Sequence, residues 1–216
     1  MIITRQKPLP ELLVHIDGKS VFLVGCSECA TLCHTGGEQE LLEMKKTLQD
    51  NKIAVTGWVV LEPACHLQND RRLLKQHTKA LEEADVVLVF ACGNGTQTVA
   101  ELIDTMDVIP GNDTLFLGEI QRAHIFEKRC TLCGDCIQDL FGGLCPLSRC
   151  PKAMLNGPCG GSIGGKCEID TDLDCIWDTI YRRLKEKGRL DRLKQIQQPK
   201  NWSASLETRR TLPHVP

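Results

Sequence analysis

The sequence predicts an α/β protein: a small parallel sheet, then a cysteine- and glycine-rich domain, then a C-terminal helix. Two observations support this prediction. Over residues 1–118, short apolar runs alternate with segments of helical periodicity. Over residues 119–188 this alternation stops, and cysteine and glycine dominate until a final amphipathic segment begins near Cys175. Residues 189–216 follow as a tail.

Short apolar runs predict the strands of the first domain. They occupy residues 21–24, 53–60, 86–90 and 115–117. Helical periodicity predicts helices at residues 38–48, at residues 69–81 and from about Gly95 onward. Strands that alternate with helices form βαβ units. We therefore expect a Rossmann-like or flavodoxin-like parallel sheet of about four strands with right-handed connections.

Cysteine content indicates the kind of chemistry. The chain has 13 cysteines in 216 residues, and an odd number cannot pair completely in disulfides. It shows neither a secretory signal nor the ~18 apolar residues of a membrane span. We therefore expect a cytoplasmic protein, in which dense cysteine usually binds metal. The net charge of −2 gives no indication of a nucleic-acid partner.

The cysteine-rich domain contains eight of these cysteines and little apolar mass, so we expect metal to organise its fold. Cys130, Cys133 and Cys136 have the C-x2-C-x2-C spacing that binds [4Fe–4S] clusters in bacterial ferredoxins. The set is completed by Cys145, Cys150, Cys159, Cys167 and Cys175. Eight thiolates suffice for two clusters. Their pairing is not readable, because eight residues rather than three precede the first Cys-Pro. Structural zinc sites, each with four cysteine ligands, are the alternative.

Five further cysteines follow the predicted strands. In a parallel sheet the carboxyl ends of the strands share one edge, where ligands bind. We predict that one [4Fe–4S] cluster binds there to Cys26, Cys29, Cys33 and Cys92, with Cys65 as an alternative ligand or a neighbouring thiol. Helices that begin near Gly37 and Gly95 would direct backbone N–H groups at this anionic group.

Other interpretations of the sheet edge remain open. Zinc could replace iron there, and buried apolar cysteines or a C-x2-C redox dithiol are further alternatives. The segment from Cys92 to Gly95 lacks the full G-x-G-x-x-G pattern of a phosphate-binding loop. His34 and His66 each stand beside a cysteine and could also bind metal.

Two stretches of sequence carry a family resemblance. CTLCGDCIQDLFGGLCPLSRCPKAMLNGPCGGSIGGKCEID, at residues 130–170, resembles the C-terminal methylenetetrahydrofolate reductase family, a cysteine-rich module. Together with GCSECATLCHTGGEQE and VVLVFACGNGTQTVAE in the first domain, it is similar to the small iron–sulfur subunit of methylenetetrahydrofolate reductases from acetogenic bacteria. The resemblance covers roughly residues 10–205.

The resemblance implies a non-catalytic, electron-transferring subunit. Its partner would be a TIM-barrel subunit that holds a flavin and reduces 5,10-methylene- to 5-methyltetrahydrofolate. Electrons would come from ferredoxin or another redox protein and pass through three [4Fe–4S] clusters. The alternative is a zinc-binding scaffold subunit of the same enzyme. No His-based triad, acidic pair or phosphate loop suggests independent catalysis, and the tail with Trp202 could dock the partner.

Overall fold

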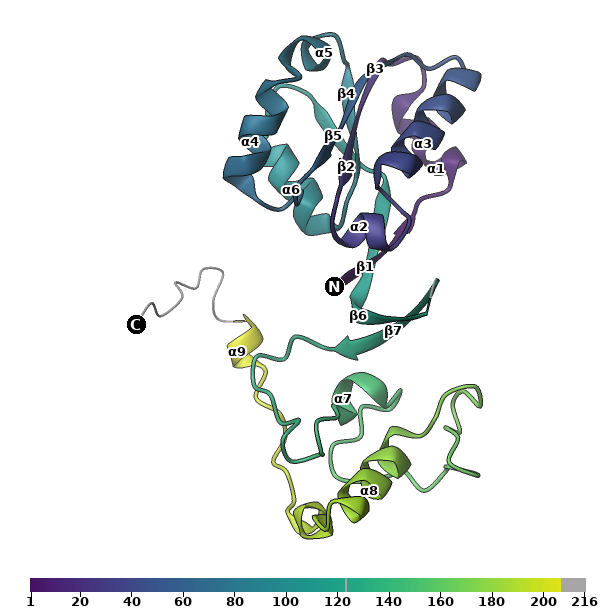
Figure 1. The fold of residues 1–216 in the computed structure, drawn as a ribbon, viewed down its shortest axis with the longest axis vertical. Coiled ribbons are helices and arrows are strands. Elements are labelled where there is room, and N and C mark those ends of the chain that lie inside the picture. Colours follow the sequence, from purple (N-terminus) through teal and green to yellow (C-terminus); the bar gives the residue numbers. More distant parts are fainter. Residues whose placement is uncertain (123, 207–216) are drawn as a thin grey trace. The chain divides into compact units, whose positions relative to one another are not determined.

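The computed structural model describes residues 1–122 and 124–206 (Figure 1). The chain divides into two compact units. Most of the first unit is Met1–Phe116, and the second is built from Leu117–Gln121 and the chain from Glu127 onward. Each unit has its own core, so each is described by itself.

A four-stranded parallel sheet organises the first unit, as the sequence predicts. Its strands stand in the order β3-β2-β4-β5, and their bounds are β2 Val21–Cys26, β3 Val55–Leu61, β4 Val86–Phe90 and β5 Asp107–Pro110. The register pairs Cys26 with Leu61 and Gly25 with Phe90. The strands β2, β3 and β4 therefore end close to one level.

Helices cover both faces of this sheet (Figure 1). Their bounds are α1 Leu9–Ile16, α2 Cys29–Leu32, α3 Glu38–Asp50, α4 Leu67–Lys75, α5 Thr78–Glu82 and α6 Gly93–Leu102. Along β2, Phe22 and Val24 belong to the core cluster that includes residues of α4 and α6, whereas Val21 and Leu23 belong to the cluster of α1 and α3. Burial on both faces explains why β2 and β4 are continuous apolar runs.

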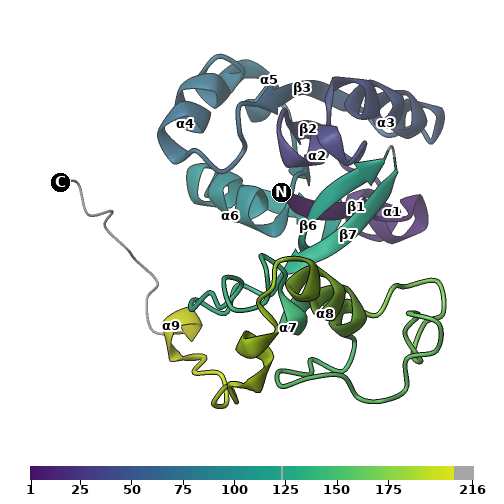
Figure 2. The same ribbon diagram turned by 60° about the horizontal axis from the view of Figure 1, so that its bottom comes forward.

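The fourth strand of the parallel sheet was predicted wrongly. It is β5, whereas residues 115–117 belong to β6 (Asn112–Arg122). That strand lies in a three-stranded sheet of order β1-β6-β7, with β1 at Ile2–Gln6 and β7 at Ile125–Cys130 (Figure 2). Neither face of β6 is fully covered, and Leu115 is 44% exposed. Its short apolar run therefore does not mark a buried central strand.

Two helical segments also differ from the prediction. Residues 69–81 form two helices rather than one, because the chain turns between α4 and α5 at Gln76 and His77, whose N–H groups bond to Leu73 and Leu74. Helix α1 was not predicted. It has a proline in its first turn, where the missing N–H costs nothing.

The second unit has a small core around one helix. Its helical elements are α7 Pro146–Arg149, α8 Ile176–Glu186, the 3-10 helix η1 Leu190–Lys194 and α9 Ser203–Leu206. The predicted C-terminal helix is confirmed as α8. Its buried residues are Ile176, Trp177, Ile180 and Leu184. Gly188 follows the helix with a φ of +63°, as expected for a C-terminal stop.

Part of the predicted tail packs on this core. Leu190 and Leu193 contact the α8 cluster. Further along, the Asn156 amide donates to the Gln197 carbonyl at 2.8 Å, and Trp202 is 43% exposed. The prolines Pro213 and Pro216 of the predicted tail lie outside the described residues.

Close packing at the sheet edge predicts a large effect of Gly36→Ala. The Gly36 carbonyl accepts a hydrogen bond from the Cys26 N–H at 2.9 Å. A Cβ at Gly36 would lie 1.9 Å from the Phe90 carbonyl oxygen, which belongs to the central strand β4. We expect Gly36→Ala to lower the free energy of unfolding by about 1–3 kcal/mol, measured by urea denaturation. Gly93→Ala is the control, since its Cβ would meet nothing closer than Thr114 Oγ1 at 3.4 Å. Equal stability of the two variants would contradict the packing.

Ser20 and Asp85, which precede β2 and β4 at the opposite edge of the sheet, predict a pH-dependent stability. The Ser20 N–H and hydroxyl donate to Asp85 Oδ2 at 2.7 and 2.8 Å, which ties the beginning of β2 to the beginning of β4. These bonds lower the pKa of Asp85. The stabilisation is therefore present above the usual Asp value of about 3.9 and is lost as pH falls through the lower folded value.

We expect Asp85→Asn to lower Tm near neutral pH, with the difference from the unmodified chain shrinking below about pH 4. Calorimetry across this pH range measures it. Ser20→Ala, which removes one of the two donors, should show a smaller difference of the same sign. A Tm difference that stays constant with pH would contradict the assignment.

Candidate metal centres

Five cysteines stand at the carboxyl edge of the parallel sheet. Cys26 ends β2, and Cys92 directly precedes α6. Cys29 begins the short helix α2, Cys33 follows it, and Cys65 lies in the turn after β3. Cys26 and Cys33 are buried, Cys29 and Cys92 are partly exposed, and Cys65 is exposed. The edge therefore collects thiols from three separate strand–helix connections.

Electrostatic coupling identifies the neighbours of Cys65. Burial raises the pKa of the Cys65 thiol, and negative charge on Cys92 and Cys26 raises it further. Asp70 and Cys29 add smaller effects in the same direction. Like charges disfavour ionisation only when they are close. Cys65 therefore lies among the cysteines predicted to bind the sheet-edge cluster.

The beginning of β1 also contacts this group of cysteines. The Ile2 N–H donates to Cys29 Sγ at 3.4 Å, and the Cys33 thiol donates to the Ile2 carbonyl at 3.8 Å. An N–H group directed at sulfur stabilises the thiolate form. Sequence reasoning missed this contact, because the first residues gave no recognisable strand signal.

Local backbone geometry adds further polar groups at the sheet edge. Helix α6 begins directly after Cys92, so its dipole favours negative charge there, and its first N–H, that of Gly93, donates to Thr114 Oγ1 at 2.7 Å. The two neighbouring histidines have other partners: His34 Nδ1 lies 3.5 Å from Glu40, and His66 Nδ1 accepts from the Asn69 N–H at 3.2 Å.

The C-x2-C-x2-C segment forms a tight loop after β7. The Leu132 N–H donates to Cys130 Sγ at 3.3 Å, and the Cys133 thiol donates to the Asp135 carbonyl at 3.5 Å. Leu132 and Gly134 have φ values of 55° and 78°. These left-handed conformations allow the chain to wrap closely around a small group.

A second group of cysteines lines one small cavity in the same unit. Its four cysteines are Cys150, Cys159, Cys167 and Cys175. Arg149 and Lys152 line the same cavity. No sequence signal indicated that these four, out of eight, come together, since they are separated by irregular loops.

Charged groups surround this four-cysteine cavity. The Cys159 thiol donates to Glu168 Oε1 at 2.9 Å, and Lys152 forms an ion pair with the same carboxylate. These two contacts lower the pKa of Glu168. The pKa of Lys152 is raised chiefly by Glu168 and also by the charges of Cys159 and Cys167. A cation therefore lies beside two of the four thiols.

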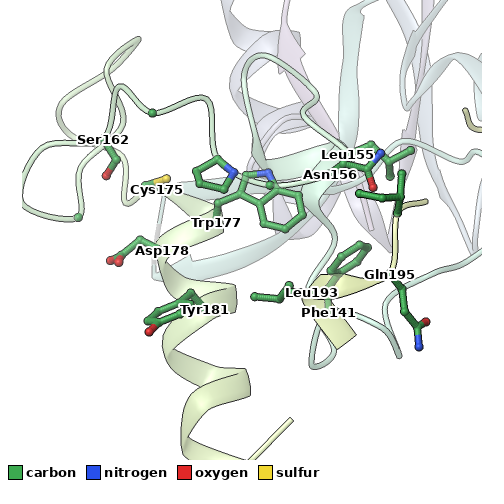
Figure 3. Close-up of a pocket in the computed structure, with 15 residues that line it drawn as sticks. Phe141, Leu155, Asn156, Ser162, Cys175, Trp177, Asp178, Tyr181, Leu193 and Gln195 are labelled. Atoms are coloured by element: carbon green, nitrogen blue, oxygen red, sulfur yellow. The ribbon is translucent and has the colours of Figure 1, made fainter. Parts of the chain in front are cut away.

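A larger open cavity of about 600 Å³ adjoins the four-cysteine cavity (Figure 3). Cys175 and Trp177 line both. Trp177 packs edge-on against Phe141, with ring centroids 5.4 Å apart, and its Nε1–H donates to the Met154 carbonyl at 3.1 Å. Tyr181, one turn along α8, is 46% exposed at the same opening. The Trp177 ring thus forms part of the wall between the two cavities.

The donor chemistry fits a thiolate-ligated metal group at both places. Each offers at least four cysteines, and each is accompanied by N–H donors or cations that stabilise negative charge. Among residues 1–122 and 124–206, no group of three or more His, Cys, Asp or Glu side chains stands in positions that could hold a metal ion. The assignments of individual ligands stay predictions.

Comparison with known proteins relates the second unit to one enzyme. Residues 109–203, from β5 to the beginning of α9, match the family model described as methylene-tetrahydrofolate reductase C terminal. This part of the chain is therefore related to methylenetetrahydrofolate reductase. No curated protein and no solved structure matched the chain. Within the described chain, no helix has the length and apolar character needed to cross a membrane.

The buried position of Trp177 predicts that it contributes strongly to the stability of the second unit. It is 4% exposed and occupies the centre of the small core of the second unit. We expect Trp177→Ala to lower the free energy of unfolding of the anaerobically purified chain by about 3–5 kcal/mol, measured by denaturant titration. Trp202→Ala, at a 43% exposed position, is the control and should change it by at most about 0.5 kcal/mol. Similar losses in both variants would contradict this packing.

Proposed function

We propose that this chain is an electron-transferring iron–sulfur subunit of a methylenetetrahydrofolate reductase. It would pass electrons to the flavin of a catalytic partner that reduces 5,10-methylene- to 5-methyltetrahydrofolate. The observation that carries the proposal is the grouping of the 13 cysteines, five at the edge of the parallel sheet and eight between Cys130 and Cys175, in a chain whose residues 109–203 match the reductase C-terminal family model.

Three [4Fe–4S] clusters account for 12 of the 13 cysteines. One would bind at the sheet edge to Cys26, Cys29, Cys33 and Cys92, with Cys65 as the alternative ligand. Two would bind to the eight cysteines of the second unit. When bound, such clusters accept and release single electrons at potentials set by charge, burial and hydrogen bonds to sulfur.

The chain's own residues would set those potentials. At the sheet edge, the Ile2 N–H bonds to Cys29 Sγ, and α6 directs its N-terminus to the region of Cys92. In the second unit, the Leu132 N–H bonds to Cys130 Sγ, and Lys152 lies beside Cys159 and Cys167. Each of these groups favours the negative charge that a thiolate-ligated cluster carries.

An electron carrier needs no catalytic side chains of its own. Its cysteines need only neighbours that orient sulfur and compensate charge, and the cysteine groups have such neighbours. The substrate chemistry, on this proposal, belongs to the flavin-containing TIM-barrel partner. Ferredoxin or another redox protein would supply the electrons.

A zinc-binding scaffold of the same enzyme is the second candidate. Sets of four cysteines are also the ligands of structural zinc sites, so the donor chemistry supports this interpretation too. The two functions differ in one measurable property, since zinc cannot change its oxidation state in these sites.

Metal analysis of the anaerobically purified chain, alone and with its flavoprotein partner, tests the proposal. We expect about 12 iron atoms and as many acid-labile sulfides per chain, which is three clusters of four, and EPR signals after reduction. In stopped-flow mixing, the reduced chain should transfer electrons to the flavin of the partner. Stoichiometric zinc without iron, or reduced clusters that leave the flavin oxidised, would sink the electron-carrier function.

A further inference from the structure

We propose that the eight cysteines of the second unit bind their two clusters in consecutive sets. Cys130, Cys133, Cys136 and Cys145 hold one cluster, and Cys150, Cys159, Cys167 and Cys175 hold the other. This pairing rests on the proposed function, which requires two clusters here but leaves open which cysteines share one.

The four-cysteine cavity is the first observation that supports this pairing. It is lined by all of Cys150, Cys159, Cys167 and Cys175, although the first and last are 25 positions apart in the sequence. Among the described residues that line it there is no member of the Cys130 triplet, and Cys145 is absent as well. Four thiols around one cavity match the ligand number of one cubane cluster.

Backbone pairing explains how the loops bring the later cysteines together. The Cys175 N–H donates to the Gly165 carbonyl at 2.7 Å, and the Cys167 N–H donates to the Leu173 carbonyl at 2.9 Å. An antiparallel bridge joins Lys166 to Asp174 between these two bonds. Cys167 therefore faces Leu173 and Cys175 faces Gly165, so the two cysteines lie diagonally on facing segments, two positions apart in register.

Helix α7 separates the two cysteines that precede proline. Cys145 stands before its first residue and Cys150 directly after its last. A four-residue helix rises about 6 Å, so the two thiols belong to opposite ends of α7. Cys150 reaches the four-cysteine cavity from the second of these ends.

The end that carries Cys145 is tied to the C-x2-C-x2-C loop. The Ser148 hydroxyl lies 2.8 Å from the Arg129 carbonyl and 3.5 Å from the Cys145 carbonyl, and it can donate to either. Arg129 directly precedes Cys130. The bond to the Arg129 carbonyl holds α7 beside the residue that precedes the triplet, and the Cys145 carbonyl lies near the same hydroxyl. On this proximity we assign the fourth thiol of the triplet to Cys145.

Charged groups of both signs line the four-cysteine cavity. Arg149 and Lys152 line it together with the carboxylates of Glu168 and Asp174. Cys159 loses its proton when it binds iron and can then no longer donate to Glu168. Lys152 remains as the partner of that carboxylate and stays beside the thiolates of Cys159 and Cys167. One cation therefore stays beside two of the thiolates after the cluster binds.

The proposed pairing differs from the exchange seen in two-cluster ferredoxins. There the cysteine before proline, which follows the C-x2-C-x2-C run, binds the other cluster. The same exchange here would make Cys145 a ligand of the cluster bound by the later cysteines, and one of those later cysteines a ligand of the cluster bound by the triplet. Cys145 and Cys150 are therefore the decisive pair, since each precedes proline and they flank the same helix.

Single and double alanine variants of the full chain, purified anaerobically, test the pairing by iron content and by EPR after reduction. We expect Cys145→Ala to lose about four iron atoms and the same EPR signal as Cys133→Ala. Cys150→Ala should lose a different signal, the one also lost in Cys167→Ala. The double variant C150A/C167A should lose no more iron than either single variant, whereas C145A/C150A should lose about eight.

The pairing is overturned if the double variant C145A/C167A loses only about four iron atoms. The same loss of only about four iron atoms in C133A/C150A would also overturn it. The EPR signal of the sheet-edge cluster serves as the folding control in every variant. Should one alanine substitution remove both clusters, the serine variant decides, because its oxygen can keep the iron and shift the g-values of only the cluster it ligates. Absence of iron in the unmodified chain defeats the proposed function, whereas iron with exchanged pairing defeats this inference alone.

Discussion

The small core around α8 is the constraint on which the second unit depends. Its fully buried apolar residues are Phe141 and four residues of α8, and long stretches between Cys130 and Cys175 bury almost nothing apolar. A segment of this length with so little apolar burial needs another source of folding free energy. Ligand binding that occurs only in the folded state provides one. On the proposed function, the clusters would therefore have a structural role in this unit as well as a redox role.

The first unit, in contrast, has an extensive hydrophobic core. Its sheet is covered on both faces, and Phe22, Leu23, Leu88 and Phe90 are completely buried, so the sheet stands without metal. The thiols at its edge are placed by strand register rather than by ligand binding. A cluster there would bind at the edge of a sheet with its own hydrophobic core, whereas clusters in the second unit would help to fold the loops that bind them.

This difference explains how much could be predicted from the sequence. The buried runs of β2 and β4 are continuous because both faces are covered, and parallel strands end at one edge, so the convergence of Cys26 and Cys92 follows from local patterns. Strand β5 was missed because Asp107–Pro110 is short and only half-buried. The contact of Ile2 with Cys29 could not be predicted, because β1 shows no clear alternation of apolar and polar residues.

In the second unit, local patterns indicated the chemistry but not the arrangement. The spacing of Cys130, Cys133 and Cys136 is local and points to a cluster by itself. The gathering of Cys150 and Cys175 around one cavity depends on backbone bonds between loops, which no residue period encodes. Only α8, with its strong amphipathic pattern, could be placed from the sequence.

The surroundings of the cysteines also bear on how the proposed clusters would differ. Reduction adds an electron to an already anionic cluster, so burial makes it harder, and nearby cations or exposure to water make it easier. Cys26 and Cys33 are buried, whereas Cys136 and Cys159 are exposed and Lys152 lies beside Cys159. Backbone N–H groups offset part of the cost at the sheet edge. On these terms the proposed sheet-edge cluster would have a lower potential than a cluster bound to Cys159 and its neighbours in the second unit.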